Sequence, residues 1–308
     1  MGQKDDKIRV PAYLAKGDTI LLIATARKIS EEELNPAISE LKKWGLKVEL
    51  GPNIYKARHQ FAGTDQQRAA DLQWAIDHPK AKAILVARGG YGTIRIMDKV
   101  RLKDLRRNPK WVIGYSDVTA LHSELNNIGM VSLHATMPIN FEKSKAATAS
   151  LKNALFGENF SYPIKPNILN RTGTCEGELV GGNLSLLYAL SGTENDLYTK
   201  NKILFIEDLD EYLYHIDRMM LQLKRSGKLK RLKGLIVGGM SDMKDNAIPF
   251  GKNAEQIILE AVSEYNYPVC FGFPAGHIKD NFAMYLGKNA RLTVNKSKIS
   301  LIYPTNDL

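Results

Sequence analysis

Short apolar runs alternate with amphipathic stretches through the first half of the chain. Capping boxes that begin at Ser30 and Thr64 predict helices over about 31–44 and 65–77, with Pro36 either bending the first helix or marking its first turn. The runs that predict strands are 17–24, 46–50, 83–87 and 111–113. Strand–helix–strand alternation of this kind is typical of a parallel, doubly wound α/β sheet.

The second half shows a weaker pattern. Pro163, Pro166 and Gly173 interrupt a polar stretch that follows a short helical segment at 143–152. Beyond it we expect strands at 203–206, 234–237 and 268–271, helices at 212–225 and 253–265, and a hairpin at 291–302. We therefore predict an N-terminal α/β domain over 1–145, a linker over 146–174 and a smaller, mixed α/β domain over 175–308.

Ser116 follows the buried strand that begins at Trp111, and it precedes a stretch with helical periodicity. A serine on such a strand-to-helix turn projects its hydroxyl into a cleft at the positive end of the helix. Two interpretations are open, because Ser116 or Asp117 would also serve as an ordinary helix cap. The turn by itself predicts a nucleophile only weakly.

The segment Arg88-Gly-Gly-Tyr-Gly92 also follows a predicted strand. Its exposed backbone N–H groups would hold a phosphate or a developing oxyanion, whereas the alternative is a tight turn that needs positive φ. The spacing matches neither a Walker A loop nor a dinucleotide-binding fingerprint, so a nucleotide site has little support.

Two further residues lie just past predicted strands, where open α/β sheets bind ligands. Glu207 ends an apolar run, so we expect its carboxylate to be partly buried and to need a partner. His277 lies in a loop rich in proline and glycine. Ser116, Glu207 and His277 together meet the requirement for a nucleophile, a base and a residue that orients the base. We interpret His122 and His134 as structural.

Composition narrows the class of protein without identifying it. The 308 residues are 44% hydrophobic and 25% charged, which is ordinary for a globular protein with a substantial core. The net charge of +10 comes from dispersed basic residues, so we expect solubility or an anionic small substrate and no nucleic-acid partner. Two cysteines are too few for a disulfide framework. Without a signal peptide, a membrane span or metal-ligand spacing, we predict a cytoplasmic protein with no cofactor or metal.

Five motifs in order resemble those of the LD-carboxypeptidases. These enzymes are the muramoyltetrapeptide carboxypeptidases, serine peptidases that are grouped with the microcin C self-immunity peptidases. The resemblance covers nearly the whole chain, and one departure is Ala24-Thr-Ala-Arg-Lys28, where the family commonly carries a proline–serine pair beside the cleft. The motifs are 88–92 (RGGYG), 114–117 (GYSD), 181–185 (GGNLS), Glu207-Asp208 with 216–218 (IDR), and Gly276-His277.

The resemblance implies a flavodoxin-like or glutamine-amidotransferase-like N-terminal domain and a C-terminal domain that supplies a glutamate and a histidine. It makes Ser116 the nucleophile, His277 the general base and Glu207 the residue that orients the base. The backbone N–H groups of Asp117 and Gly90 would form the oxyanion hole. The substrate would contact Arg88, Gly89, Tyr91 and Tyr115.

The hypothesis is therefore a cytoplasmic, homodimeric serine carboxypeptidase that releases the terminal D-alanine from murein tetrapeptide during peptidoglycan recycling. An acyl-adenylate peptidase of the microcin-immunity type, with the same three residues, is one alternative. The other is a non-catalytic protein that holds a phosphate or nucleotide at 88–92. Neither a membrane nor a nucleic acid is expected as a partner.

Overall fold

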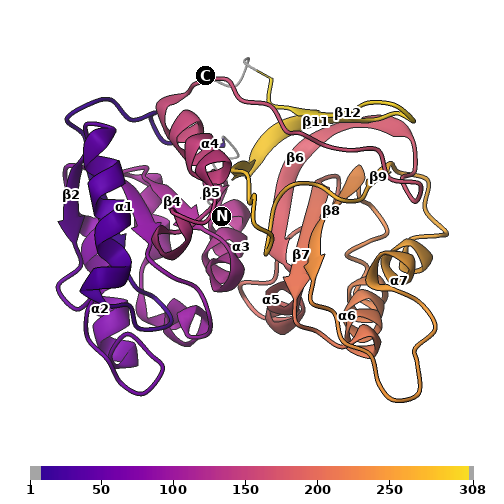
Figure 1. Cartoon of the computed structure of the whole chain (residues 1–308), viewed down its shortest axis with the longest axis horizontal. Helices are drawn as coiled ribbons and strands as arrows, with labels where there is room; N and C mark the ends of the chain where they lie inside the picture. Colours follow the sequence, from indigo (N-terminus) through magenta and orange to yellow (C-terminus); the bar gives the residue numbers. More distant parts are fainter. Residues whose placement is uncertain (1–7, 305–308) are drawn as a thin grey trace, which may run out of the picture.

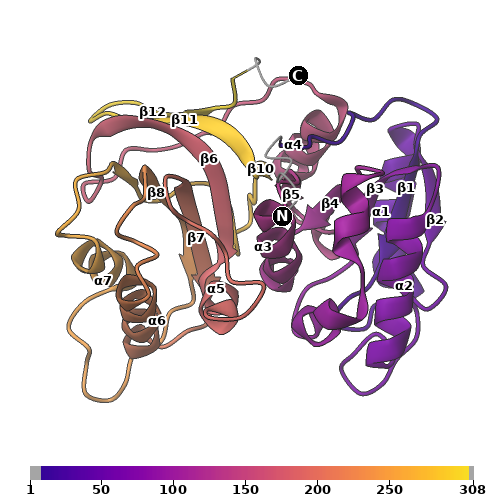
Figure 2. The same ribbon diagram turned by 180° about the vertical axis from the view of Figure 1, so that it is seen from behind.

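The computed structural model describes residues 8–304, which form two parts that each contain a six-stranded sheet (Figure 1). Figure 2 shows from behind that α3 (Thr119–Asn127), β5 (Ser132–His134) and β10 (Met284–Leu286) lie where the two parts meet. None of the helices within residues 8–304 has both the length and the apolar character needed to cross a membrane.

The first sheet has the strand order β10-β5-β4-β3-β1-β2, and its first five strands in sequence are parallel. Side chains of β1 alternate between two apolar clusters, so this sheet is buried on both faces as the apolar runs predict. Its strands from the first half of the chain are β1 (Thr19–Ile23), β2 (Lys47–Leu50), β3 (Ala81–Val86), β4 (Trp111–Gly114) and β5 (Ser132–His134).

Four helices cover the two faces of this sheet. Helices α1 (Glu31–Lys43) and α4 (Lys145–Phe156) pack on one face, and α2 (Asp65–Asp77) and α3 (Thr119–Asn127) pack on the other. Both expected capping boxes are present, and Pro36 lies inside α1 and does not mark its first turn. The connections contain 3₁₀ helices η1 (Thr93–Lys99), η2 (Leu102–Arg106), η3 (Ser116–Val118) and η4 (Pro138–Asn140).

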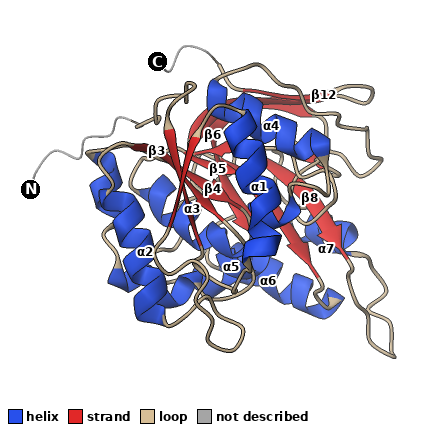
Figure 3. Ribbon diagram, turned by 60° about the vertical axis from the view of Figure 1, so that its left-hand side comes forward, coloured by secondary structure: helices blue, strands red, loops and turns tan. Residues whose placement is uncertain are grey.

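The second sheet has the order β12-β11-β6-β7-β8-β9, with β6 to β9 parallel and the last hairpin antiparallel. Three helices pack on one face of this sheet, as Figure 3 shows from the side. The strands are β6 (Gly173–Asn183), β7 (Ile203–Leu209), β8 (Gly234–Ser241), β9 (Val269–Cys270), β11 (Lys288–Val294) and β12 (Ile299–Ile302). The helices are α5 (Leu184–Leu190), α6 (Leu213–Arg225) and α7 (Ala254–Ala261).

Helix α4 agrees with the helical segment expected at 143–152 and packs on the first sheet, so that only 157–172 of the expected linker 146–174 lacks regular helix or strand. Three strands, β5, β6 and β10, lie outside the runs that predict strands. Strand β6 was not expected, because its many glycines favour a turn. Strand β10 (Met284–Leu286) was not expected either, and it pairs antiparallel with β5, which brings the second half of the chain onto the first sheet.

A close contact between the two parts depends on the glycine pair at the end of β6. A Cβ atom added to Gly182 would lie 2.5 Å from Thr119 Oγ1, at the first residue of α3. The same hydroxyl oxygen accepts a hydrogen bond of 2.9 Å from the backbone N–H of Asn183. The glycine therefore allows a strand of one part to touch a helix of the other.

We predict that Gly182→Ala destabilises the protein by about 2 kcal/mol or more, because it adds a clash with Thr119 to the strain of a φ of +142°. Chemical denaturation measures this loss. Gly227→Ala is the matched control, since Gly227 has a φ of +77° with nothing within 4 Å of an added Cβ. The control should lose about 1 kcal/mol, and an equal loss in both variants would contradict the close contact.

Candidate active site

Ser116 has the backbone of a strained nucleophile turn. Strand β4 ends at Gly114, and Ser116 follows as the first residue of η3 with a φ of +64°. This left-handed conformation is costly for a residue with a side chain, and it persists only where the surrounding structure imposes it. The turn lifts Ser116 out of the strand direction and leaves its side chain partly exposed.

The structure brings Ser116, His277 and Glu207 together, although 161 residues separate the first two in sequence. His277 Nε2 lies 3.0 Å from Ser116 Oγ, and His277 Nδ1 lies 2.7 Å from Glu207 Oε2. The backbone N–H of His277 also donates to Glu207 Oε2, at 2.9 Å. Because a carboxylate only accepts, Nδ1 carries the proton of the neutral ring and Nε2 is free to accept from the Ser116 hydroxyl.

Glu207 is fully buried inside β7, where the register against β8 shifts between Ile206 and Asp208. Such an irregularity redirects a side chain that would otherwise follow the sheet. Gly276 lies directly against the glutamate, since an added Cβ there would be 2.6 Å from Glu207 Oε2. The glycine before the histidine thus lets the loop approach the carboxylate.

The buried ion pair shifts both pKa values in opposite directions. Burial by itself would lower the pKa of His277, but the Glu207 carboxylate and its hydrogen bond outweigh burial and raise it. Burial by itself would raise the pKa of Glu207, but the nearby His277 outweighs it and lowers the pKa. Glu207 therefore stays ionised and stabilises a positive charge on His277.

The glycine loop lies against the serine. A Cβ added to Gly89 would be 3.2 Å from Ser116 Oγ, so only glycine leaves this side of the hydroxyl open. The Asp117 carboxylate accepts from the backbone N–H of Thr93 at 2.8 Å. It ties the end of the loop to the serine turn, and burial raises its pKa. The Asp117 carboxylate is thus engaged in holding the loop.

Two recesses flank His277 and share a wall. One, of about 160 Å³, contains Ser116, and the other, of about 260 Å³, extends toward Lys279. Their common lining residues are Tyr115, Asn140, Lys143 and His277. Ser116 opens into the smaller recess, and His277 lies between the two.

The recess that contains Ser116 is cationic. Arg27, Arg88 and Lys143 line it, and none of the lining residues within 8–304 is an aspartate or a glutamate. Arg88 also donates to Glu33 Oε1 and to the Lys28 carbonyl, each at 3.3 Å, so part of its guanidinium braces the loop. Sequence reasoning missed Arg27 and Lys143 as site residues. The only signal for Arg27 was its place in the loop that departs from the family pattern.

The two expected substrate tyrosines lie in different environments. Tyr115 is buried, its ring centroid lies 4.9 Å from that of His277, and its hydroxyl accepts from Asn140 Nδ2 at 2.7 Å. Burial raises the pKa of Tyr115 to about 12. Tyr91 is 48% exposed and packs against Phe61, and it is not among the residues that line either recess.

Asp208, next to Glu207, is a buried residue of the second part and not a surface group. Its carboxylate accepts from Asn183 Nδ2 and from the backbone N–H of Ser185, both at the start of α5. Burial and the neighbouring Glu207 raise the pKa of Asp208 to about 6. Its contacts explain why the 181–185 motif and the Glu207-Asp208 motif occur together.

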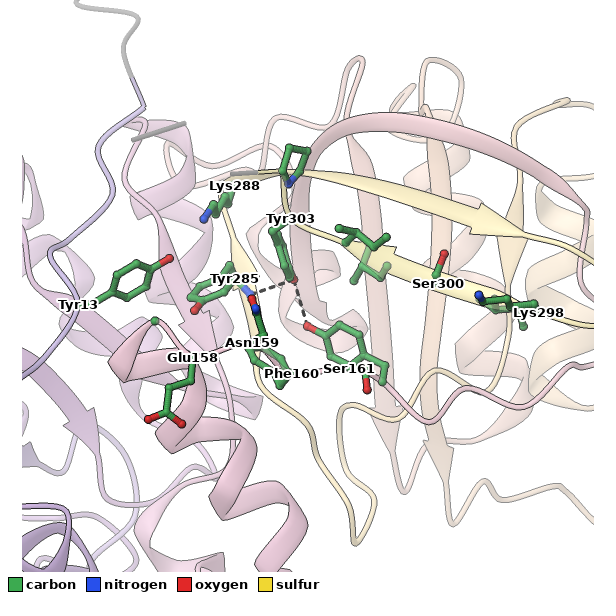
Figure 4. Close-up of a pocket in the computed structure, with 16 residues that line it drawn as sticks. Tyr13, Glu158, Asn159, Phe160, Ser161, Tyr285, Lys288, Lys298, Ser300 and Tyr303 are labelled. Carbon is green, nitrogen blue, oxygen red and sulfur yellow. Dashed lines mark hydrogen bonds between the residues drawn. The ribbon is translucent and has the colours of Figure 1, made fainter. Parts of the chain in front are cut away.

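A larger cavity, of about 490 Å³, lies apart from Ser116 and contains none of the three residues (Figure 4). Its tyrosine hydroxyls are engaged within the protein, since Tyr162 donates to the Ala283 carbonyl and Tyr285 donates to the Ala154 carbonyl. Lys298 lies near the right edge of the view and Lys288 lies left of its centre. Among the described lining residues no nucleophile is paired with a base.

Together, the fold and the site define a hydrolase that is built from two α/β parts, with Ser116, His277 and Glu207 where the parts meet. Comparison with protein families agrees with the motifs. Residues 20–135 match the LD-carboxypeptidase N-terminal domain, and residues 176–292 match the LD-carboxypeptidase C-terminal domain. The chain belongs to the LD-carboxypeptidase family, which makes it a peptidase.

Relatives match over almost their full length. A probable murein peptide carboxypeptidase of Bacillus subtilis is 36% identical, with 94% of this chain and 93% of the relative covered. The murein tetrapeptide carboxypeptidase of Pseudomonas aeruginosa is 28% identical, and the match covers 90% of this chain and 94% of the relative. The crystal structure of a muramoyltetrapeptide carboxypeptidase from Oxalobacter formigenes superposes with a TM-score of 0.85 at 30% identity. The superposition covers 93% of this chain and 100% of that structure. The microcin C7 self immunity protein MccF has the same fold, at 23% identity.

We predict that the pKa of His277, measured by NMR titration, lies above the ordinary histidine value of 6.5. In Glu207→Gln it should fall below 6.5, because burial then acts without the carboxylate. Glu211→Gln is the matched control, since Glu211 binds the ring of His215 instead, at 2.6 Å. A His277 pKa that stays the same in Glu207→Gln would contradict the electrostatic role of Glu207.

Proposed function

We propose that this protein is a serine-type LD-carboxypeptidase that releases the terminal D-alanine of murein tetrapeptide by cleaving the L,D-peptide bond. The observation that carries this proposal is the juxtaposition of Ser116, His277 and Glu207 beside a recess with three cations and no acid. A murein tetrapeptide ends in a carboxylate, which such a recess attracts.

In the proposed reaction His277 Nε2 takes the proton of Ser116 Oγ as the oxygen attacks the carbonyl carbon of the L-centre of the diamino acid. The backbone N–H groups of Asp117 and Gly90 hold the oxyanion, and each donor is worth about 3 kcal/mol of the barrier. His277 returns the proton to the D-alanine amine as the C–N bond breaks. Water, activated by the same ring, then hydrolyses the acyl-enzyme.

The cations would select substrates with a free terminal carboxylate. Arg27 forms no ion pair with a carboxylate of residues 8–304, and it lies over Gly90, because an added Cβ there would be 2.6 Å from Arg27 Cγ. Arg88 stays in the proposal as a second contact, with part of its guanidinium engaged by Glu33. Lys143 lines both recesses and provides a third charge. We propose Gly89, Tyr91 and Tyr115 as further substrate contacts.

The resemblance also implies a cytoplasmic enzyme that acts as a homodimer in peptidoglycan recycling. Two alternatives make different predictions for one set of assays. An immunity peptidase of the microcin type would cleave an aminoacyl-sulfamoyl adenosine in preference to tetrapeptide. A non-catalytic phosphate-binding protein would bind nucleotide at 88–92 and would not be acylated at Ser116 by a serine-directed probe.

Ser116→Ala should lose D-alanine release from tetrapeptide by at least about a thousandfold, because the acyl-enzyme does not form. Release of D-alanine, measured by a coupled oxidase assay, checks this. The variant should keep its melting temperature, which separates lost chemistry from lost folding. Retained activity would rule out Ser116 as the nucleophile.

Arg27→Gln should raise KM for tetrapeptide about tenfold with little change in kcat, because it removes a contact that substrate and transition state share. Lys103→Gln removes an exposed cation on η2, outside both recesses, and should leave KM unchanged. A substrate analogue with an amidated C-terminus should be insensitive to Arg27→Gln. Equal effects on both substrates would contradict recognition of the carboxylate by Arg27.

A further inference from the structure

His134 lies between the segments that carry Ser116 and His277, and the mechanism above gives it no role. It is the last residue of β5 and is fully buried. Its register partner in β4 is Gly114, two residues before Ser116. Its partner in β10 is Met284, in the strand that follows the His277 loop. The backbone of His134 thus pairs with segments of both halves of the site, and its ring centroid lies 5.8 Å from that of Tyr115.

Four buried polar atoms near this ring have no hydrogen-bond partner among the described protein groups. They are both ring nitrogens of His134, Glu207 Oε1 and Asn281 Nδ2. The orientation of the amide is fixed, because Asn281 Oδ1 accepts from the backbone N–H of Gly276 at 2.8 Å. Buried polar groups are almost always paired, so these four unpaired atoms indicate that they form hydrogen bonds with one another, directly or through water.

The neighbouring His122 shows how a purely structural histidine is satisfied here. It is also fully buried, yet its Nε2 donates to the Gly114 carbonyl and its Nδ1 accepts from Ser132 Oγ, both at 2.9 Å. All of its hydrogen-bonding capacity is used within the first sheet. His134 differs because the unpaired polar groups near it, Glu207 Oε1 and Asn281 Nδ2, belong to the second half of the chain.

The ring of His134 is neutral across the physiological range. Burial lowers its pKa to about 4, and the Glu207 carboxylate and the Asn281 side chain oppose that shift without reversing it. The titratable groups around it are Tyr115, His122, Glu207 and His277. Tyr115 and His122 are also neutral, with pKa values of about 12 and about 3. Of these four groups, only His277 changes its charge near neutral pH.

We propose that His134 is a positioning residue that completes the hydrogen bonding of Glu207. One ring N–H is donated to Glu207 Oε1 and the other nitrogen accepts from Asn281 Nδ2, directly or through one water molecule. A neutral imidazole has one donor and one acceptor, so this arrangement pairs all four atoms. Glu207 Oε1 and Oε2 are then held separately, by His134 and by His277.

This arrangement, which rests on the proposed function for its catalytic meaning, fixes the rotation of the Glu207 carboxylate toward His277 Nδ1. It also places a positive N–H dipole beside the carboxylate, which moderates the rise in the pKa of His277. Removal of the dipole should raise the pKa of His277 further, so that the base is protonated up to a higher pH.

The test compares His134→Phe, which keeps a ring without nitrogens, with His134→Gln, which keeps a donor and an acceptor. His134→Phe should lower kcat for D-alanine release about tenfold with KM unchanged. The acid limb of the kcat/KM profile should move to higher pH, and His134→Gln should recover part of both effects. His122→Asn is the control for lost packing, and it should lower stability without moving the profile.

NMR titration of His277 in the same variants gives a readout that needs no substrate. A raised His277 pKa in His134→Phe without any D-alanine release would support the arrangement and reject the proposed function. D-alanine release with an unmoved pKa and profile would overturn the arrangement. If His134→Phe does not fold, NMR titration of His134 in the wild-type protein replaces it. A His134 ring that titrates between about pH 5 and pH 8 would contradict the proposal.

Discussion

The buried pair of Glu207 and His277 is the interaction on which the arrangement of the site depends. A carboxylate with no exposed surface is tolerated only when charge and hydrogen bonds compensate for lost water. The backbone N–H of His277 supplies one of these hydrogen bonds. The irregularity in β7 and the close approach of Gly276 allow the carboxylate and the histidine loop to meet. The result is an imidazole held at the boundary between the two parts, facing Ser116 from the opposite side.

The nucleophile side is built by a different physical means, namely backbone strain. Ser116 adopts a left-handed φ, and the Asp117 carboxylate anchors the same turn to Thr93. Glycines at 89 and 182 leave room where other residues would meet Ser116 or Thr119. The histidine side of the site thus depends mainly on a buried ion pair, and the serine side depends mainly on backbone conformation and close packing.

Local patterns predicted most helices and strands, because capping boxes and apolar runs report short-range preferences. The positions of Ser116, Glu207 and His277 after predicted strands, together with the family motifs, also predicted which side chains the structure brings together, although Glu207 lies inside β7 and not past its end. Strand β10 could not be predicted, since three residues carry no periodicity and their partner lies 150 residues away in sequence. Arg27 and Lys143 were missed for a similar reason, because a cation on a loop has no local signature of the recess it faces.

The placement of β10 has a consequence for the order of events during synthesis. Because β10 comes late in the chain and pairs with β5, the first sheet keeps an open edge while the ribosome makes more than a hundred further residues. An unpaired edge invites wrong partners. The first part is therefore completed only when the last strands arrive, and the same short stretch of chain delivers His277 to Ser116. A hydrolytic centre assembled this late stays inert in the nascent protein.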